Sequence, residues 1–142
     1  MKPSDLKHYT TVVFSNADRS HCTKLKVGAI AVKDRRIICE GFNGTIPGDN
    51  NDCESEDIFG ELKTRNTVEH AERNLISYAA RKGIALEGAT LYVTHAPCIP
   101  CSRAILNAGI KEVFYFNSHN DDEGPEFLRY IGKIAVTKLT IN

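Results

Sequence analysis

Two short motifs, His70-Ala71-Glu72 and Pro97-Cys98-Ile99-Pro100-Cys101, constrain the fold more than any other feature of the sequence. They carry one imidazole and two thiols, and zinc in proteins is bound by such groups. Cys98 and Cys101 are three residues apart, so on a helix they share one face and can reach one ion. With His70 as a third ligand, the fourth position of a tetrahedral zinc is left for water. The sequence therefore predicts a fold that brings the two motifs together.

The residues between the motifs predict how they can meet. Thr67 can cap a helix that ends at the cations and the glycine of residues 81–83. Residues 90–94 have the pattern of a strand, and residues 98–108 predict a second helix that ends at Gly109. A helix, a turn, a strand and the start of another helix are enough to bring both motifs to one place.

The rest of the pattern predicts an α/β fold with a mixed sheet. Because helices and strands alternate after an opening antiparallel hairpin, we expect layers of helices against a sheet. A helix separates the last two strands, so these two can run parallel. The predicted segments are a helix from Ser4, strands over 27–32 and 36–42, a long irregular loop over 43–66, a strand over 111–116, a helix over about 125–131 and a strand over 134–136.

Length and composition favour one globular domain and disfavour several classes of protein. One core fits in 142 residues, and the 18 basic side chains balance the 18 acidic ones. The zero net charge disfavours nucleic acid as a partner, and no apolar run is long enough to cross a membrane. The polar start of the chain has no apolar signal core, so we expect a cytoplasmic protein, or one in the host cytoplasm if its source is a virus.

The five cysteines do not predict a disulfide framework. Their number is odd, and the absence of a signal peptide favours a compartment that keeps thiols reduced. Metal binding, catalysis and burial are therefore the open interpretations. Cys39 lies in an apolar strand, and we expect it to be a buried small side chain.

Glu72 suggests what the metal site does. A carboxylate near a zinc-bound water can take its proton and pass it to a leaving amine, as hydrolytic deamination requires. Each motif alone has a simpler explanation: the cysteine pair as half of a structural zinc site or as a redox pair, and the His-x-Glu triplet as chance. Both motifs in this order form the signature of zinc-dependent nucleobase deaminases.

The sequence resembles the cytidine deaminase superfamily, and within it the deoxycytidylate (dCMP) deaminases. The resemblance covers about residues 4–120. It is carried by the two motifs and by residues 27–30, 41–45, 73–74, 87–94 and 107–111. It implies a single zinc-dependent domain over residues 1–142 with a three-layer α/β/α cytidine deaminase-like fold and a five-stranded mixed sheet.

The resemblance also implies a reaction and its residues. His70, Cys98 and Cys101 would hold Zn²⁺, and Glu72 would shuttle protons while a zinc-activated hydroxide converts dCMP to dUMP and ammonia. The dUMP would supply dTMP synthesis. The backbone around Ala71 and Cys98 would orient the base.

Further substrate contacts are implied with several alternatives. Asn43 would hydrogen-bond the sugar, and the candidates for the phosphate are Asn43, Thr45 and a cation such as Lys26. A solvated surface lysine is the simpler interpretation of Lys26. His119 stands where many relatives have a tyrosine that contacts the nucleotide, and it could make that contact pH-dependent. A lone surface histidine is the alternative there.

Cys22 and Cys53 match positions that hold a second, structural zinc in some relatives. The further ligands of those relatives are absent between Cys53 and His70, and two thiolates helped by His21 or Glu69 make an incomplete tetrahedral set. A second metal site therefore stays open as a prediction.

The resemblance implies a homohexamer that dCTP activates, with Mg²⁺ on the bound dCTP, and that dTTP inhibits. Two other functions stay open: another zinc deaminase such as a tRNA adenosine deaminase, and a catalytically inert nucleotide-sensing module. The zero net charge weighs against an RNA substrate, since RNA affinity depends on neutralising phosphates. Glu72 weighs against an inert module, because a structural zinc has no use for that carboxylate.

Overall fold

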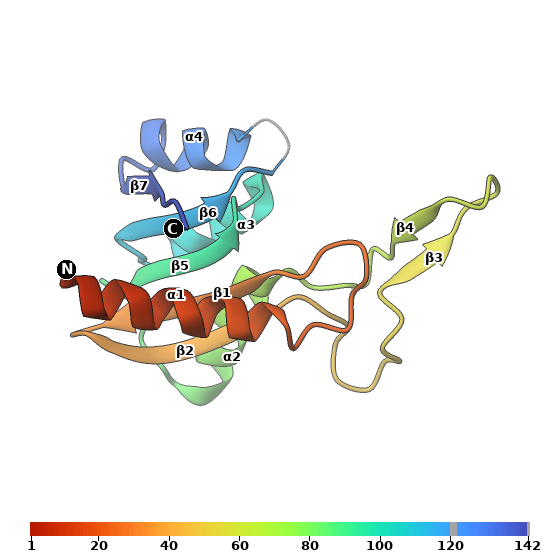
Figure 1. The fold of residues 1–142 in the computed structure, drawn as a ribbon, viewed down its shortest axis with the longest axis horizontal. Helices are drawn as coiled ribbons and strands as arrows, with labels where there is room; N and C mark the ends of the chain where they lie inside the picture. The colour runs from red at the N-terminus through yellow and green to blue at the C-terminus, as the bar shows by residue number, and fades with distance from the viewer. Residues whose placement is uncertain (120–121, 142) are drawn as a thin grey trace.

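A five-stranded sheet forms the centre of the computed structural model, which describes residues 1–119 and 122–141 (Figure 1). Its strand order is β2-β1-β5-β6-β7. β1 pairs antiparallel with β2 and β5, and the β5–β6 and β6–β7 pairs are parallel. The sheet is therefore mixed, as predicted. The strands are β1 (Gly28–Lys33), β2 (Arg36–Phe42), β5 (Thr90–His95), β6 (Glu112–Asn117) and β7 (Ala135–Lys138).

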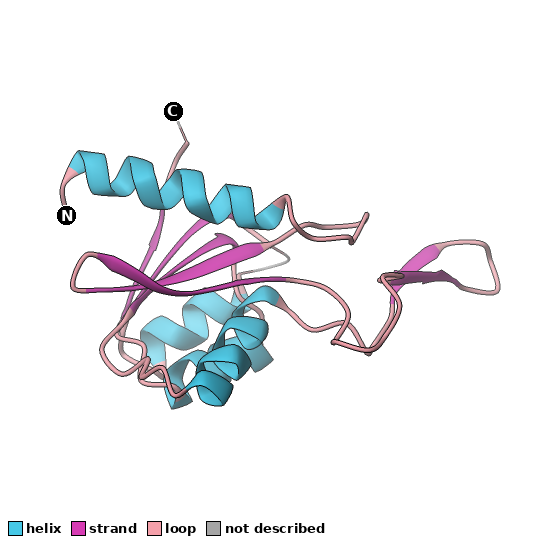
Figure 2. Cartoon of the chain, turned by 90° about the horizontal axis from the view of Figure 1, so that it is seen from below, coloured by secondary structure: helices cyan, strands magenta, loops and turns pink. Residues whose placement is uncertain are grey.

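Helices cover both faces of this sheet and complete the predicted three layers. Figure 2 shows α1 alone on one face and the other helices together on the opposite face. The helices are α1 (Pro3–Ala17), α2 (Ala71–Lys82), α3 (Ile99–Asn107) and α4 (Glu123–Tyr130). None of the helices within the described residues is long and apolar enough to cross a membrane.

Strand β1 shows why the sequence folds into layers. Ala29 and Ala31 belong to the core under α2 and α3, whereas Ile30 and Val32 belong to the core under α1. Because both faces of the strand are covered, its sequence is a nearly continuous apolar run. Small side chains on one face let α2 approach the sheet closely.

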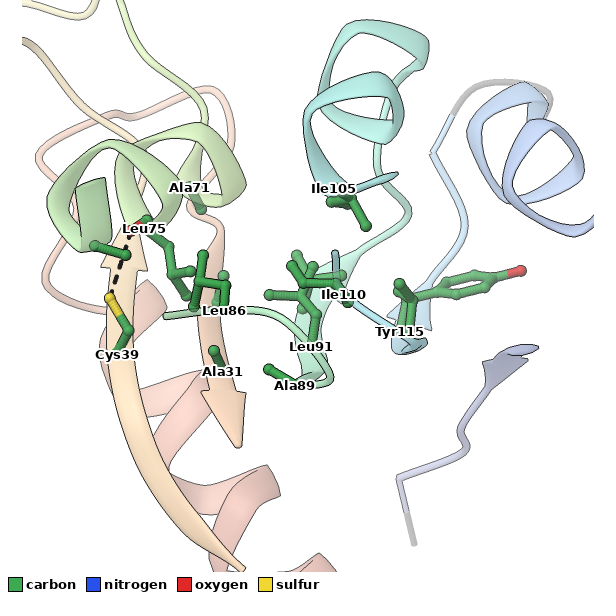
Figure 3. Close-up of a cluster of buried hydrophobic side chains, with 14 of the residues drawn as sticks. Ala31, Cys39, Ala71, Leu75, Leu86, Ala89, Leu91, Ile105, Ile110 and Tyr115 are labelled. Atoms are coloured by element: carbon green, nitrogen blue, oxygen red, sulfur yellow. Dashed lines mark hydrogen bonds between the residues drawn. The ribbon is translucent and has the colours of Figure 1, made fainter. Parts of the chain in front are cut away.

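The larger core lies between the sheet and the helices α2 and α3. Figure 3 shows Leu75 of α2 and Ile105 of α3 pointing toward Leu91 of β5, and all three are fully buried. Cys39 is buried in the same cluster, as predicted, and its thiol donates to the carbonyl oxygen of Leu75 at 3.4 Å.

The start of α2 differs from the prediction. We expected Thr67 to cap the helix, but α2 begins at Ala71 with His70 as its N-cap. The reason is a backbone pair in which Glu69 and Gly44 exchange both hydrogen bonds, at 2.8 and 3.1 Å. This pair keeps the chain extended up to His70 and so decides where the first motif stands.

The predicted irregular loop over residues 43–66 contains regular structure that the sequence analysis missed. Strands β3 (Glu54–Glu56) and β4 (Leu62–Thr64) form an antiparallel hairpin that projects from the body (Figures 1 and 2). The carboxylate of Asp57 orders its turn by accepting the backbone N–H groups of Phe59 and Glu61 at 2.8 and 3.0 Å.

A disulfide joins Cys22 to Cys53, so the expectation that these thiols are reduced is wrong for this structure. Their Cα atoms lie 5.2 Å apart although 31 positions separate them in sequence. The bond connects the chain between α1 and β1 to the start of β3. Such a contact depends on tertiary structure, and the spacing of cysteines does not reveal it.

We predict that Gly28→Ala destabilises the protein by about 1–3 kcal/mol, the usual cost of overpacking a filled interior. An added Cβ would lie 2.6 Å from the backbone nitrogen of Ala17, and closer still to the carbonyl oxygen of Val13. Helix α1 would have to move off β1. Urea unfolding measures the change in the free energy of unfolding.

Gly44→Ala is the matched control, because an added Cβ there meets nothing within 4 Å. We expect it to change the free energy of unfolding by no more than about 0.5 kcal/mol. Equal effects of the two substitutions would contradict the close packing of α1 on β1.

Candidate active site

The two motifs meet where α2 and α3 begin. His70 is the N-cap of α2, Cys98 is the N-cap of α3, and Cys101 lies in the first turn of α3. The His70 Nδ1 atom is 3.4 Å from the Cys98 sulfur and 3.3 Å from the Cys101 sulfur. The three candidate ligand atoms all lie within 4.8 Å of one another.

The chemistry of this cluster fits a zinc ion. A hydrogen bond from the Cys101 thiol lowers the pKa of Cys98 to about 4, and a further hydrogen bond with His70 acts in the same direction. The pKa of Cys101 is raised by its hydrogen bond to Cys98 and by burial. Cys98 is therefore readily ionised to a thiolate, whereas Cys101 keeps its proton. A divalent cation bound to the cluster would favour loss of the Cys101 proton as well. A set of one imidazole and two thiolates is typical of a catalytic zinc site.

Glu72 stands in the first turn of α2 with its side chain almost completely buried, at 4% exposure. Burial raises the pKa of its carboxyl to about 7. A carboxyl that titrates near neutral pH can both accept and donate a proton there. These properties suit a general acid–base beside the candidate metal ligands.

A cavity of about 380 Å³ opens beside the cluster. This volume lies within the usual range for small-molecule sites. His70, Glu72 and Cys98 form part of its wall. The other lining residues are Cys22, Lys24, Leu25, Val27, Asn43, Glu54, Thr64, Val68, Ala71, His95, Ala96 and His119.

The structure places some of the predicted substrate residues in this cavity and not others. Asn43, Ala71 and His119 line it, whereas Thr45 and Lys26 do not. The ammonium group of Lys26 donates to the carbonyl oxygen of Ser20 instead.

Asn43 has a structural task as well as a place in the cavity. Its Oδ1 accepts the backbone N–H of Val27 at 2.9 Å, and its Nδ2 donates to the carbonyl oxygen of Leu25 at 2.8 Å. The side chain thereby fixes the chain that enters β1. The remaining amide hydrogen is available to another acceptor.

Sequence analysis missed Lys24, Glu54 and His95 as cavity residues. His95 ends β5, and its Nδ1 atom lies 3.0 Å from the hydroxyl of Thr94. That hydroxyl accepts the backbone N–H of Gly28, so its own hydrogen can go to Nδ1 and leave Nε2 as the donor. Burial and the nearby His119 lower the pKa of His95. The signal for His95 in the sequence is its place two residues before the second motif.

The disulfide bears on the predicted second metal site. The sulfur atoms of Cys22 and Cys53 lie within 4.8 Å of a Glu54 carboxylate oxygen, and neither His21 nor Glu69 joins the group. In the disulfide form the sulfurs are bonded to each other and have no thiolate charge for a metal.

Comparison with known proteins agrees with this site. Residues 3–117 match the family described as "Cytidine and deoxycytidylate deaminase zinc-binding region". ComE operon protein 2 of Bacillus subtilis is 41% identical over 97 residues, which cover 68% of this chain and 51% of that protein. The chain thus spans about half the length of this relative. Deoxycytidylate deaminase of Mycobacterium phage D29 is 34% identical over 125 residues, or 80% of this chain and 95% of that one.

A solved structure is similar over nearly the whole chain. It is the dCMP deaminase of cyanophage S-TIM5 in complex with dCMP and dUMP, with a TM-score of 0.89 and 36% sequence identity. The match covers 98% of this chain and 99% of that one.

We predict that Cys98→Ser abolishes tight zinc binding, because it removes the readily ionised thiolate of the cluster. Purified protein would contain little zinc by mass spectrometry of the metal, whereas the unchanged chain would contain a full complement. Cys39→Ala is the control, since that thiol lies in the core and outside the cluster. Zinc retained by Cys98→Ser at the level of the control would contradict the assignment.

Proposed function

Since the chain belongs to the family of cytidine and deoxycytidylate deaminases, we propose that it hydrolyses dCMP to dUMP and ammonia. One observation carries the proposal: the metal-binding set and the buried carboxyl of Glu72 meet at the wall of one cavity. The similarity to an enzyme whose structure contains dCMP and dUMP supports this choice of substrate. The product would serve as the precursor of dTMP.

His70, Cys98 and Cys101 would hold the zinc ion that the proposal requires. Zinc at this position supplies Lewis acidity, which lets a water molecule act as a nucleophile at neutral pH. Both cysteines stand at the N-terminus of α3, where the helix dipole favours thiolates.

Glu72 would move the protons of the reaction. Its carboxylate accepts one proton from the attacking water and delivers it to the ring nitrogen beside the reacting carbon. It then transfers the second proton to the exocyclic amine, which leaves as ammonia. A pKa of about 7 supports this role, because both protonation states are accessible at neutral pH.

The proposed contacts to dCMP combine the family resemblance with the lining of the cavity. The backbone around Ala71 would orient the base, and Asn43 would use its remaining amide hydrogen on the sugar. Thr45 and Lys26 stay candidates for the phosphate, although neither lines the cavity. Lys24 already lines the cavity and is the simpler source of a cation.

We predict that Glu72→Gln lowers the kcat of dCMP deamination by at least about 10²–10⁴-fold, the usual contribution of a general acid–base. The amide keeps the shape of the side chain but cannot carry the proton. Loss of the cytosine absorbance measures the rate, and zinc content measured on the same sample should stay unchanged. Glu126→Gln on α4, an exposed carboxylate outside the cavity, should keep the full rate.

The same assay separates the proposed function from its alternatives. Cytidine, dCTP and a tRNA anticodon stem-loop replace dCMP in parallel reactions. Deamination of the RNA but not of dCMP would favour a tRNA deaminase. Bound zinc and bound dCMP without release of ammonia would favour an inert nucleotide-sensing module.

We further propose that copies of the chain assemble into a homohexamer whose activity responds to dCTP, bound with Mg²⁺, and to dTTP. The proposal comes from the resemblance to the deoxycytidylate deaminases, and the family match over residues 3–117 supports that resemblance.

Effector sensitivity is testable in the same assay. We predict that dCTP with Mg²⁺ lowers the dCMP concentration needed for half-maximal rate and that dTTP raises it, because each would shift the population of active subunits. ATP at the same concentration controls for the chelation of metal. A rate that responds to neither deoxynucleotide would contradict the regulatory proposal and leave the proposed reaction intact.

A further inference from the structure

The β3–β4 hairpin, residues 54–64, carries the two most exposed large apolar side chains of residues 1–119 and 122–141. We call it the arm. It stands clear of the body in both ribbon views (Figures 1 and 2). Ile58 and Phe59 at its tip are 93% and 83% exposed. A projecting, exposed apolar pair of this kind is typical of a protein–protein contact.

The base of the arm is fixed rather than loose. The disulfide holds Cys53, directly before the arm, to the loop that follows α1. The carboxylate of Glu54 accepts hydrogen bonds from Thr23 and Lys24 in the same loop. Arg65, at the other end of the arm, donates its backbone N–H to the carbonyl oxygen of Cys53 at 2.7 Å.

The tip is ordered as well. The Asp57 carboxylate holds the turn, and the backbone N–H of Asp57 donates to the carbonyl oxygen of Glu61 at 2.8 Å. An isolated two-stranded hairpin is marginally stable in water, so these anchors hold Ile58 and Phe59 in a defined position. Ordering a contact before it forms reduces the entropy that association costs.

A groove on the same chain has the complementary character. It is a cavity of about 720 Å³ along β2, the edge strand of the sheet, between α1 and α2. Its wall combines apolar side chains with the charged groups of Arg19 and Glu40 and the backbone of β2, and comprises Val12, Arg19, Ile37, Ile38, Cys39, Glu40, Gly41, Phe42, Tyr78 and Ile84. We call it the edge groove. An open edge strand is a liability that proteins usually cover.

The charges of the two surfaces also match. Arg19 stacks at 5.0 Å over the ring of Phe42, and Lys82 lies 5.9 Å from the ring of Tyr78. Within residues 1–119 and 122–141, neither cation has a carboxylate oxygen within 4.0 Å. The arm tip places Glu56 and Asp57 directly beside its apolar pair. The groove wall also holds Glu40, whose carboxylate accepts the side-chain amide of Asn16 at 3.3 Å, and Lys82 stands beside the wall residue Tyr78. The two cations outnumber that carboxylate, so the charge at the groove is opposite to that at the arm tip, which favours specific pairing.

We propose that the arm tip of one copy of this chain docks in the edge groove of a second copy. The proposal rests on the self-assembly proposed above and names the surfaces that form it. Each copy carries one tip and one groove, so the contact can close a symmetric pair or a ring. Glu54 and Thr64 at the base of the arm also line the active-site cavity, so the contact would brace one wall of that cavity.

The test measures the mass of the full-length chain by light scattering over a range of concentrations. We expect Ile58→Ser with Phe59→Ser to weaken self-association by at least about tenfold, as for other central interface residues. The matched control is Tyr130→Ser with Ile131→Ser, an adjacent exposed apolar pair at the end of α4. The control should keep the mass of the unchanged chain.

A charge exchange then tests the groove itself. Glu56→Lys and Lys82→Glu should each weaken association, and the two together should restore at least part of it. An unchanged mass for the tip variant, a chain that is monomeric at every concentration, or no restoration by the charge exchange would each overturn the proposal. The dCMP assay on the same samples distinguishes failure of the arm contact from failure of the proposed reaction. A chain that assembles through the arm but does not deaminate dCMP would contradict only the proposed reaction.

Discussion

The approach of two helix starts to one point is the constraint on which the rest of this structure depends. An imidazole, two thiols and a buried carboxyl lie together where α2 and α3 begin. Cys101 and Glu72 are buried, and burying groups that can carry a charge costs free energy, since a charge there loses its hydration. The helix N-termini offset part of this cost for Cys98 and Cys101, and a divalent cation would offset more. The unfavourable grouping is thus itself a sign of a metal-dependent site.

Backbone contacts outside the motifs hold this grouping in place. The Gly44–Glu69 pair stops α2 from starting earlier and so presents His70 as its N-cap. Gly41 lets β2 pass close to α2, because a side chain there would lie 2.6 Å from the carbonyl oxygen of Ala71. Asn43, two residues later, ties the entry of β1 to the same region. The glycines and the asparagine near residue 43 therefore set the geometry of the site before any of them meets a substrate.

The sequence was sufficient to predict the three layers of helices and sheet and the meeting of the motifs at residues 70–72 and 97–101. Both predictions depend on local periodicity and on residue chemistry. It was not sufficient for the arm, because Glu54-Ser55-Glu56 and Leu62-Lys63-Thr64 lack the alternating apolar pattern of a strand. The Cys22–Cys53 bond and the place of His95 in the cavity were missed for another reason. Each depends on where a side chain points after the chain has folded. The place of His95 two residues before the second motif indicates its neighbourhood but not that direction.

The arm and the catalytic cavity share a boundary, which connects assembly to chemistry in physical terms. Cys22, Glu54 and Thr64 line the cavity, and two of them also belong to the arm. Interfaces and packed walls of this kind change between discrete arrangements rather than deforming smoothly. A contact at the arm would therefore favour the arrangement in which Glu54 and Thr64 keep their present places in the cavity wall. Substrate binding would favour the arrangement that fits the nucleotide, and by reciprocity it would strengthen the contact that supports this arrangement.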